Sequence, residues 1–183
     1  MKIFAFCASN NSESINKKLL EESCRNFQNH EVKFKVMNDF DLPIFSQDLE
    51  RDNHTYPQAA QTFLDLTADN DAIVIATPEH NSSIPAAFKN IVDWCSRSPN
   101  LNGEKIFRNK PVLLLSTSPG GRGGSTNLKH LETIMPWWGA DIRFSLSIPS
   151  FFEHFDQSEA SFDKETKEKV QGVSTQFLDS LQN

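Results

Sequence analysis

The chain has 183 residues but only three cysteines, and it has no block of basic residues. Cys7, Cys24 and Cys95 are odd in number and form no C-x-x-C pair, which argues against a disulfide scaffold or a zinc knuckle and fits a reducing compartment. A packing role is favoured over redox chemistry for Cys7 and Cys95. A formal charge of −6 without a run of Lys or Arg disfavours partners such as nucleic acid or an anionic membrane.

Long apolar runs are also missing. None approaches the ~20 residues that a membrane-spanning helix requires. The N-terminus enters a predicted strand at Lys2 without the apolar core of a signal peptide. No linker, internal repeat or low-complexity segment interrupts the chain. We therefore expect a single cytoplasmic domain over residues 1–183, which at this length buries roughly 70% of its unfolded surface.

The chain does contain a regular alternation of strand and helix signals. Strands are predicted at residues 2–7, 32–37, 71–76, 111–115 and 140–148, and helices at 14–27, 57–68, 85–97, 125–135 and 164–181. Helical crossovers of this length predict an α/β fold with a parallel sheet covered on both faces. Right-handed crossovers favour the doubly wound strand order 2-1-3-4-5, with the alternating strand 32–37 at an edge.

Three unusual loops follow the first, third and fourth predicted strands, and in this fold they meet at one edge of the sheet, where open α/β sheets bind ligands. We name them the first loop (residues 8–14, ASNNSES), the third loop (77–85, TPEHNSSIP) and the fourth loop (116–124, STSPGGRGG). The first loop offers hydroxyls, amides and the N–H groups of a helix N-terminus, but no Lys or Arg lies between Ser9 and Asn16. It predicts a neutral anion site, although an ordinary Ser/Asn-rich turn fits equally well.

The third loop carries the residues of greatest chemical interest. Pro78 fixes its backbone, and Glu79 and His80 follow as a pair of titratable side chains, which also fit solvated loop residues. The next residues, Asn81 and Ser82, suit either a helix cap or contacts to a planar heterocycle. No H-E-x-x-H pattern or second ligand cluster accompanies His80, so no metal site is expected.

The fourth loop holds four of the seven glycines, all within residues 120–124. Glycine permits close approach of the backbone to a flat ligand. The loop has neither the Walker A lysine nor the G-x-G-x-x-G spacing, so it is not a P-loop or a dinucleotide fingerprint. Arg122 is the only cation in the loop; it is available to a phosphate of a nicotinamide cofactor, or it lies at a solvent-facing tip.

At these residues the chain resembles the NADPH-dependent FMN reductase family of flavodoxin-like proteins, which includes quinone, azo-dye and chromate reductases. The family's first-loop pattern G-S-x-R-x-x-S-x-N is matched with Ala8 in place of Gly and Asn11 in place of Arg. The family's P-E-Y-N followed by L-K-N-x-I-D-W is similar to residues 78–94, with His80 in place of Tyr. The resemblance covers about residues 1–140.

The resemblance implies a flavodoxin-like three-layer sandwich with FMN bound at the three loops. By position, it places Ser9, Asn11, Ser14, Ile15 and Asn16 around the FMN phosphate; Pro78, Glu79, His80, Asn81 and Ser82 along the isoalloxazine; and Ser116, Ser118, Gly120 and Gly121 near its pyrimidine side. No residue is assigned a catalytic acid–base role. Without the loop Arg, a charge-assisted contact of ~1.5–3 kcal/mol is absent, so FMN is expected to bind more weakly than in relatives. His80 removes a large aromatic face.

The same resemblance implies a two-step reaction, in which NADPH or NADH passes hydride to the flavin and a small acceptor such as a quinone takes the electrons. Two alternatives stay open: a flavodoxin-type electron carrier without NAD(P)H turnover, and a flavin-free interaction protein. Relatives are typically dimers or tetramers, so a homodimer or homotetramer is expected. The candidate interface aromatics, each of which also fits packing within its own subunit, are Phe45, Trp94, Trp137, Trp138 and residues 151–152.

Overall fold

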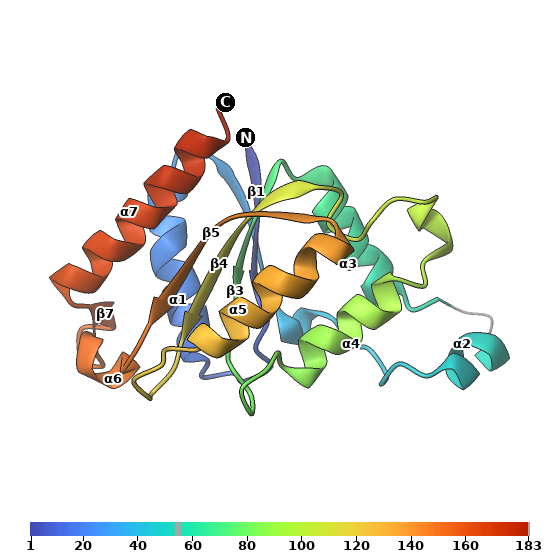
Figure 1. The fold of residues 1–183 in the computed structure, drawn as a ribbon, viewed down its shortest axis with the longest axis horizontal. Coiled ribbons are helices and arrows are strands. Elements are labelled where there is room, and N and C mark those ends of the chain that lie inside the picture. Colours follow the sequence, from blue (N-terminus) through green and yellow to red (C-terminus); the bar gives the residue numbers. More distant parts are fainter. Residues whose placement is uncertain (54–55, 183) are drawn as a thin grey trace.

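The computed structural model describes residues 1–53 and 56–182. Five parallel strands form one sheet in the order β2-β1-β3-β4-β5, which confirms the predicted doubly wound topology (Figure 1). The strands are β1 (Lys2–Cys7), β2 (Glu31–Val36), β3 (Ala72–Ala76), β4 (Lys110–Thr117) and β5 (Ala140–Ile148). The partly exposed strand β2 lies at one edge of the sheet, as its alternating sequence predicts.

Helices cover both faces of the sheet (Figure 1). One face carries α1 (Ile15–Cys24) and α7 (Lys164–Ser180), and the other carries α3 (Gln58–Asp69), α4 (Ala86–Cys95) and α5 (Ser125–Ile134). Strand β1 divides its buried side chains between the two cores: Ile3 and Cys7 pack toward α1, whereas Phe4 and Phe6 pack in the Phe-rich core that includes Phe63. Because both cores are apolar, the central strands carry apolar residues at consecutive positions.

Helix starts follow the capping residues in the sequence. Ser14 caps α1 by accepting a hydrogen bond from the Lys17 backbone N–H at 3.3 Å. Asp163 caps α7 in the same way through Thr166, and α3 begins directly after Pro57. No described helix is both long enough and apolar enough to cross a membrane.

Several short elements differ from the prediction. The first predicted helix ends as a 3-10 turn (Arg25–Phe27), and further 3-10 turns occur at Met37–Asp39, Pro99–Leu101 and Met135–Trp138. Helix α2 (Gln47–Asn53), helix α6 (Phe151–His154) and the hairpin of β6 (Phe155–Asp156) and β7 (Ser161–Phe162) are not predicted at all. The α6–β7 segment is held by aromatic contacts rather than by periodicity: the ring centroids of Phe151 and Phe155 are 4.8 Å apart.

The candidate interface aromatics differ in exposure. Trp94 and Phe151 are buried, so they pack within their own subunit and are not available to an interface. The Trp94 indole donates a hydrogen bond to the Pro43 carbonyl at 2.7 Å, which explains why this large side chain packs inside. Phe45 and Trp138 are half-buried, whereas Trp137 and Phe152 are exposed.

The strand ends that carry the three loops lie level with one another. Cys7 of β1 pairs with Ala76 of β3, which in turn pairs with Leu115 of β4. The ladder continues for one residue beyond β3, because the backbone N–H of Thr77 donates to the Leu115 carbonyl at 2.9 Å. The first, third and fourth loops therefore meet at the carboxyl edge of the sheet, as expected.

Candidate functional site

A small cavity opens beside the N-terminus of α1. Its volume is about 210 Å³, and it is lined by Cys7, Ser9, Asn11, Ser12, Ser14, Lys17, Val36 and Asn38. Ser9 and Ser14 are nearly buried, and their hydroxyl oxygens accept hydrogen bonds from the backbone N–H groups of Asn11 and Lys17. The Ser9 hydroxyl keeps its own proton for an acceptor inside the cavity, whereas the Ser14 hydroxyl also lies 3.8 Å from Cys7 Sγ, where either atom can donate.

The N-terminus of α1 is open to an anion. Its first turn contains no acidic residue, and no described residue accepts a hydrogen bond from the backbone N–H of Ile15 or Asn16. The helix dipole adds roughly half a positive charge at this end. Hydroxyls, free N–H groups and one lysine ammonium are the donor set that a phosphate requires, so the cavity fits the phosphate of FMN. The sequence analysis did not predict Lys17, because the predicted phosphate-site residues end at Asn16, one position earlier.

The side chain of Asn16 is turned into the protein. Its amide donates to the Thr117 carbonyl at 3.0 Å and accepts from the Thr117 backbone N–H at 2.9 Å, and Asn16 is 2% exposed. This paired contact fixes the first turn of α1 to the end of β4. Asn16 thus joins the first loop to the fourth loop.

The third loop forms a tight turn. His80 and Ser83 exchange two backbone hydrogen bonds of 3.0 Å, and the residues between them, Asn81 and Ser82, have φ values of 51° and 61°. Two consecutive positive φ values are those of a type I′ turn, which asparagine tolerates well. The side chains of His80, Asn81 and Ser82 are exposed at its tip. Behind it, the Ser83 hydroxyl and Nδ1 of His130 share a hydrogen bond of 3.1 Å.

Glu79 and Pro78 are held against α5. The Glu79 carboxylate accepts from the Asn127 backbone N–H at 3.0 Å, at the start of a helix whose capping residue, Gly124, has no side chain. The amide of Asn127 donates to the Pro78 carbonyl at 2.9 Å. Asn127 is fully buried, and the sequence analysis did not predict its role. The feature that could have indicated it is a polar residue next to Leu128 on the apolar face of the helix.

The glycines of the fourth loop are of two kinds. A Cβ added to Gly120 or Gly121 would meet nothing within 4 Å, so this part of the loop leaves room for a flat ligand. Gly124 has a φ of +80°, and a Cβ there would lie 1.9 Å from the Ser116 hydroxyl oxygen. Ser116 itself is fully buried and donates to the Thr77 carbonyl at 2.7 Å, which ties the fourth loop to the third.

The structure therefore brings all the predicted site residues to one edge, but it gives them different tasks. Asn16, Glu79 and Ser116 use their side chains to fix the loops to one another. Ser118 is half-buried and its hydroxyl donates to the Gly120 carbonyl at 3.1 Å, within the loop. Arg122 lies exposed at the tip.

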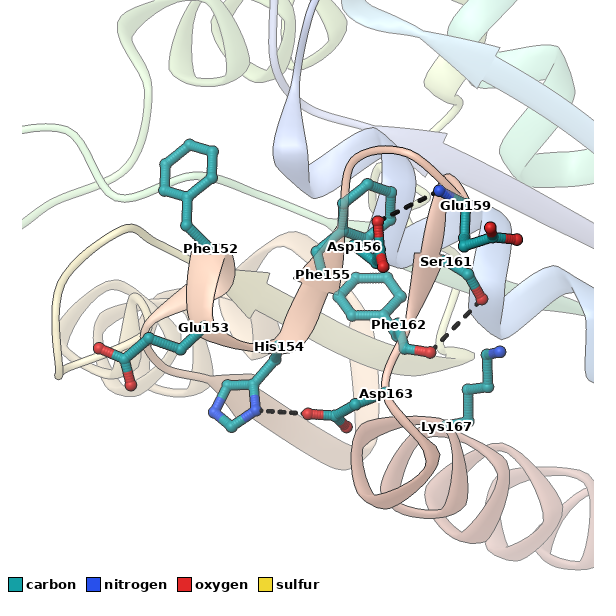
Figure 2. A pocket seen from close by; sticks show the side chains of 10 residues that line it. All are labelled: Phe152, Glu153, His154, Phe155, Asp156, Glu159, Ser161, Phe162, Asp163 and Lys167. Carbon is teal, nitrogen blue, oxygen red and sulfur yellow. Dashed lines mark hydrogen bonds and ion pairs between the residues drawn. The ribbon is translucent and has the colours of Figure 1, made fainter.

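A larger hollow lies elsewhere. Its volume is about 690 Å³, and Figure 2 shows it among α6, the β6–β7 hairpin and the start of α7. It shares no lining residue with the three loops, and two of its lining residues, His154 and Asp163, share a hydrogen bond of 2.8 Å. Among the described residues, no group of three or more His, Cys, Asp or Glu is placed to hold a metal ion. The volume of a cavity alone therefore does not identify the functional site. The hydrogen-bond donors at the three loops identify it.

The cysteines show the environments of packed thiols. Cys7 and Cys95 are fully buried, in agreement with their predicted packing role. Burial raises the pKa of both thiols, and together with the nearby Glu21 carboxylate it raises the pKa of Cys24 to about 12. All three remain protonated at neutral pH, so none is an activated nucleophile.

Comparisons with known proteins agree with this geometry. The family model described as NADPH-dependent FMN reductase matches residues 1–150. An NADPH:quinone oxidoreductase of Arabidopsis thaliana is 35% identical over 139 residues, which are 72% of this chain and 66% of the relative, just under two thirds of its length. An NAD(P)H:quinone oxidoreductase of Solanum tuberosum is 30% identical, covering 94% of this chain and 89% of the relative. Among solved structures, FerB of Paracoccus denitrificans, a flavoenzyme NAD(P)H:(acceptor) oxidoreductase, has a TM-score of 0.77 at 25% identity and covers 99% of this chain and 97% of its own.

Proposed function

The chain belongs to the NADPH-dependent FMN reductase family, and from this premise we propose that it is an FMN-dependent NAD(P)H oxidoreductase that reduces a quinone or another small acceptor. One FMN-binding domain over residues 1–183 carries the activity. The observation that carries the proposal is the meeting of three loops at one edge, with a phosphate-type donor set at the first loop and open glycines at the fourth.

When bound, FMN would supply the hydride chemistry that links NADPH or NADH to the acceptor. The residues of this chain bind and orient it. In the first loop, Ser9, Asn11 and Ser14 with the backbone N–H groups of Ile15 and Asn16 hold the phosphate. In the third loop, Pro78 and the exposed side chains of residues 80–82 line the isoalloxazine.

The fourth loop contributes backbone groups. No described residue accepts a hydrogen bond from the backbone N–H of Gly120 or Gly121, and both residues are exposed. Such N–H groups stabilise negative charge on the pyrimidine side of a bound ring. The side chains of Asn16, Glu79 and Ser116 fix the three loops in position relative to one another, which preserves the shape of the site.

A reductase is favoured over an electron carrier that does not oxidise NAD(P)H. The relatives named above are NAD(P)H:quinone oxidoreductases, and they are aligned over most of this chain. The donor set at α1 disfavours a flavin-free interaction protein, since two nearly buried serine hydroxyls line a cavity beside the open N-terminus of a helix.

Two measurements on the purified protein test the proposal. The absorption spectrum with and without added FMN shows whether flavin binds, and NADPH oxidation is then followed with and without a benzoquinone acceptor. We expect a bound-flavin spectrum and acceptor-dependent loss of NADPH. Bound FMN without NADPH loss would indicate the carrier, and no FMN binding even in excess would refute both.

We also propose that the protein is a cytoplasmic homodimer or homotetramer. Three free thiols suit a reducing compartment. The exposed side chains available to a second copy are Ile44 (85%), Trp137 (79%) and Phe152 (57%), and exposed aromatic side chains are favoured at interfaces. Light scattering at micromolar concentration measures the assembly state, and a strict monomer would contradict the proposal.

A further inference from the structure

We propose that Lys17 supplies the cationic contact to the FMN phosphate that the loop arginine supplies in the family pattern; this inference rests on the proposed FMN site. Asn11 stands at the position of that arginine, and its side-chain oxygen accepts a hydrogen bond from the Glu13 backbone N–H at 3.0 Å. Asn11 is therefore neutral and partly engaged within the loop. Among the residues that line the cavity, Lys17 is the only one with a positive charge.

The position of Lys17 on α1 directs it to the cavity. Ser14 is the capping residue, so Lys17 is the third residue of the helix. Side chains in an α-helix lean toward its N-terminus, and from the third position a four-carbon stem reaches back over the first turn. The neighbouring Lys18 points another way, because its ammonium lies 4.9 Å from the ring centroid of Phe155.

The present partner of Lys17 holds it weakly. Its ammonium lies 3.7 Å from the Glu21 carboxylate, and the two side chains are 41% and 48% exposed. Exposed pairs of this kind contribute little, since water screens them and two long side chains must be ordered. A phosphate dianion at the cavity offers Lys17 a stronger partner without any change in the backbone. No acidic residue in the first turn of α1 competes for it.

The electrostatics at the cavity floor agree with this placement. Burial raises the pKa of the Cys7 thiol; hydrogen bonds with Ser9 and Ser14 and then the charge of Lys17 oppose that rise, whereas the Glu21 carboxylate adds to it. The ammonium thus acts on the same small volume that the serine hydroxyls line.

The contact gives a specific ligand preference. An ammonium is a compact point charge, so it stabilises a bound terminal phosphomonoester but contributes nothing to the binding of an uncharged ribityl chain. Lys17 therefore selects FMN over riboflavin, while the third and fourth loops recognise the ring that both flavins share.

The test is a titration of the purified wild-type protein and of K17M, K17R and K18M with FMN and with riboflavin, followed by quenching of flavin fluorescence. K18M removes the same charge from the adjacent residue and is the matched control. We expect K17M to lower FMN affinity by about tenfold while riboflavin affinity stays unchanged, K17R to restore FMN binding, and K18M to match the wild type. Thermal unfolding without flavin separates these effects from misfolding.

A further variant tests the competition directly. E21Q frees Lys17 from its weak partner and should raise FMN affinity by about two- to threefold, with no effect on riboflavin. If the wild type binds FMN but K17M and K18M behave alike, the inference is wrong and the proposed function stands. If the wild type binds no FMN, the proposed function fails and the inference fails with it.

Discussion

The Glu79 carboxylate accepts a hydrogen bond from the backbone N–H of Asn127 at 3.0 Å, so an acidic side chain of the third loop lies at the N-terminus of α5. The helices that follow the first and fourth loops, α1 and α5, differ in this respect. The α5 terminus is neutralised by the protein's own carboxylate, whereas the first turn of α1 has no acidic residue. An anionic group of a ligand is therefore directed to α1, and the uncharged ring to the space beside α5.

Replacing Glu79 tests its role as a cap supplied from another loop. We expect E79A to lower the free energy of unfolding by about 1 kcal/mol, because α5 loses the one side-chain acceptor that the described residues place at that end. E79Q keeps an oxygen acceptor and should lose less. Urea unfolding measures both, with E13A as a surface control. A stability of E79A equal to that of E13A would show that the contact does not cap the helix.

Replacing Asn16 tests the tie between the first and fourth loops. N16A leaves the Thr117 backbone N–H and carbonyl buried without partners, and each costs about 1–3 kcal/mol. We expect a loss of about 2–4 kcal/mol in the free energy of unfolding, measured by urea denaturation. N11A changes an exposed side chain of the same type and should change stability by less than about 1 kcal/mol. Similar losses in the two variants would contradict the assigned role.

The topology was predictable because it depends on local patterns. The continuous apolar run at residues 111–115 and the alternating run at 32–37 distinguish a central strand from an edge strand, and crossover rules then leave one simple order. The α6–β7 segment was not predictable, since Phe151, Phe155 and Phe162 form their cluster at irregular spacing. The apolar residues of this segment show no helix or strand periodicity from which its elements could be predicted.

The site was predictable to the level of loops but not of side-chain direction. Strand order alone brings the three loops together. That the Asn16 amide turns inward depends on Thr117, which is 101 positions away in the chain, and a local pattern does not contain that contact. Lys17 was missed for another reason: it lines the first-loop cavity although its position lies outside the loop in sequence.

The two kinds of glycine in the fourth loop give a paired prediction. G124A forces a Cβ against the Ser116 hydroxyl and a side chain into a left-handed conformation, so we expect a loss of about 2–4 kcal/mol in the free energy of unfolding. G121A adds a methyl group in open space and should change stability by less than about 0.5 kcal/mol. Urea unfolding compares them. A destabilised G121A together with an unaffected G124A would reverse the assignment.

The cap of α7 gives a prediction for acid pH. Slight burial raises the pKa of Asp163, but hydrogen bonds from Thr166 and His154 outweigh it and hold this pKa below its usual range. Figure 2 shows the contact between His154 and Asp163. Because the folded pKa lies below the unfolded value, the carboxylate stabilises the protein fully above the unfolded pKa of about 3.9, and this contribution is lost as the pH falls through the folded pKa. D163A should therefore be less stable than the wild type by about 1 kcal/mol at pH 7, with the difference shrinking below about pH 4.

The D163N variant separates the cap from its charge. Asparagine retains an oxygen for the Thr166 N–H but does not titrate, so its stability should lie near that of the wild type at pH 7 and should not follow the same acid-dependent loss. The measurement is urea unfolding at several pH values. A wild-type minus D163A difference that is constant down to pH 3 would exclude a stabilising carboxylate.

The prediction for His80 of the third loop contrasts with the one for Lys17, because it concerns the flavin ring rather than the phosphate. His80 is exposed beside the turn residues Asn81 and Ser82, where the family pattern has Tyr. H80Y supplies a larger aromatic face and should raise affinity for FMN and riboflavin alike by about three- to tenfold, whereas H80A should lower both. Because the side chain is exposed, the stability of both variants should stay within about 0.5 kcal/mol of the wild type. Fluorescence titration measures the affinities. Equal riboflavin affinities in the wild type, H80Y and H80A would place the isoalloxazine away from the third loop, while leaving the phosphate contact of Lys17 untouched.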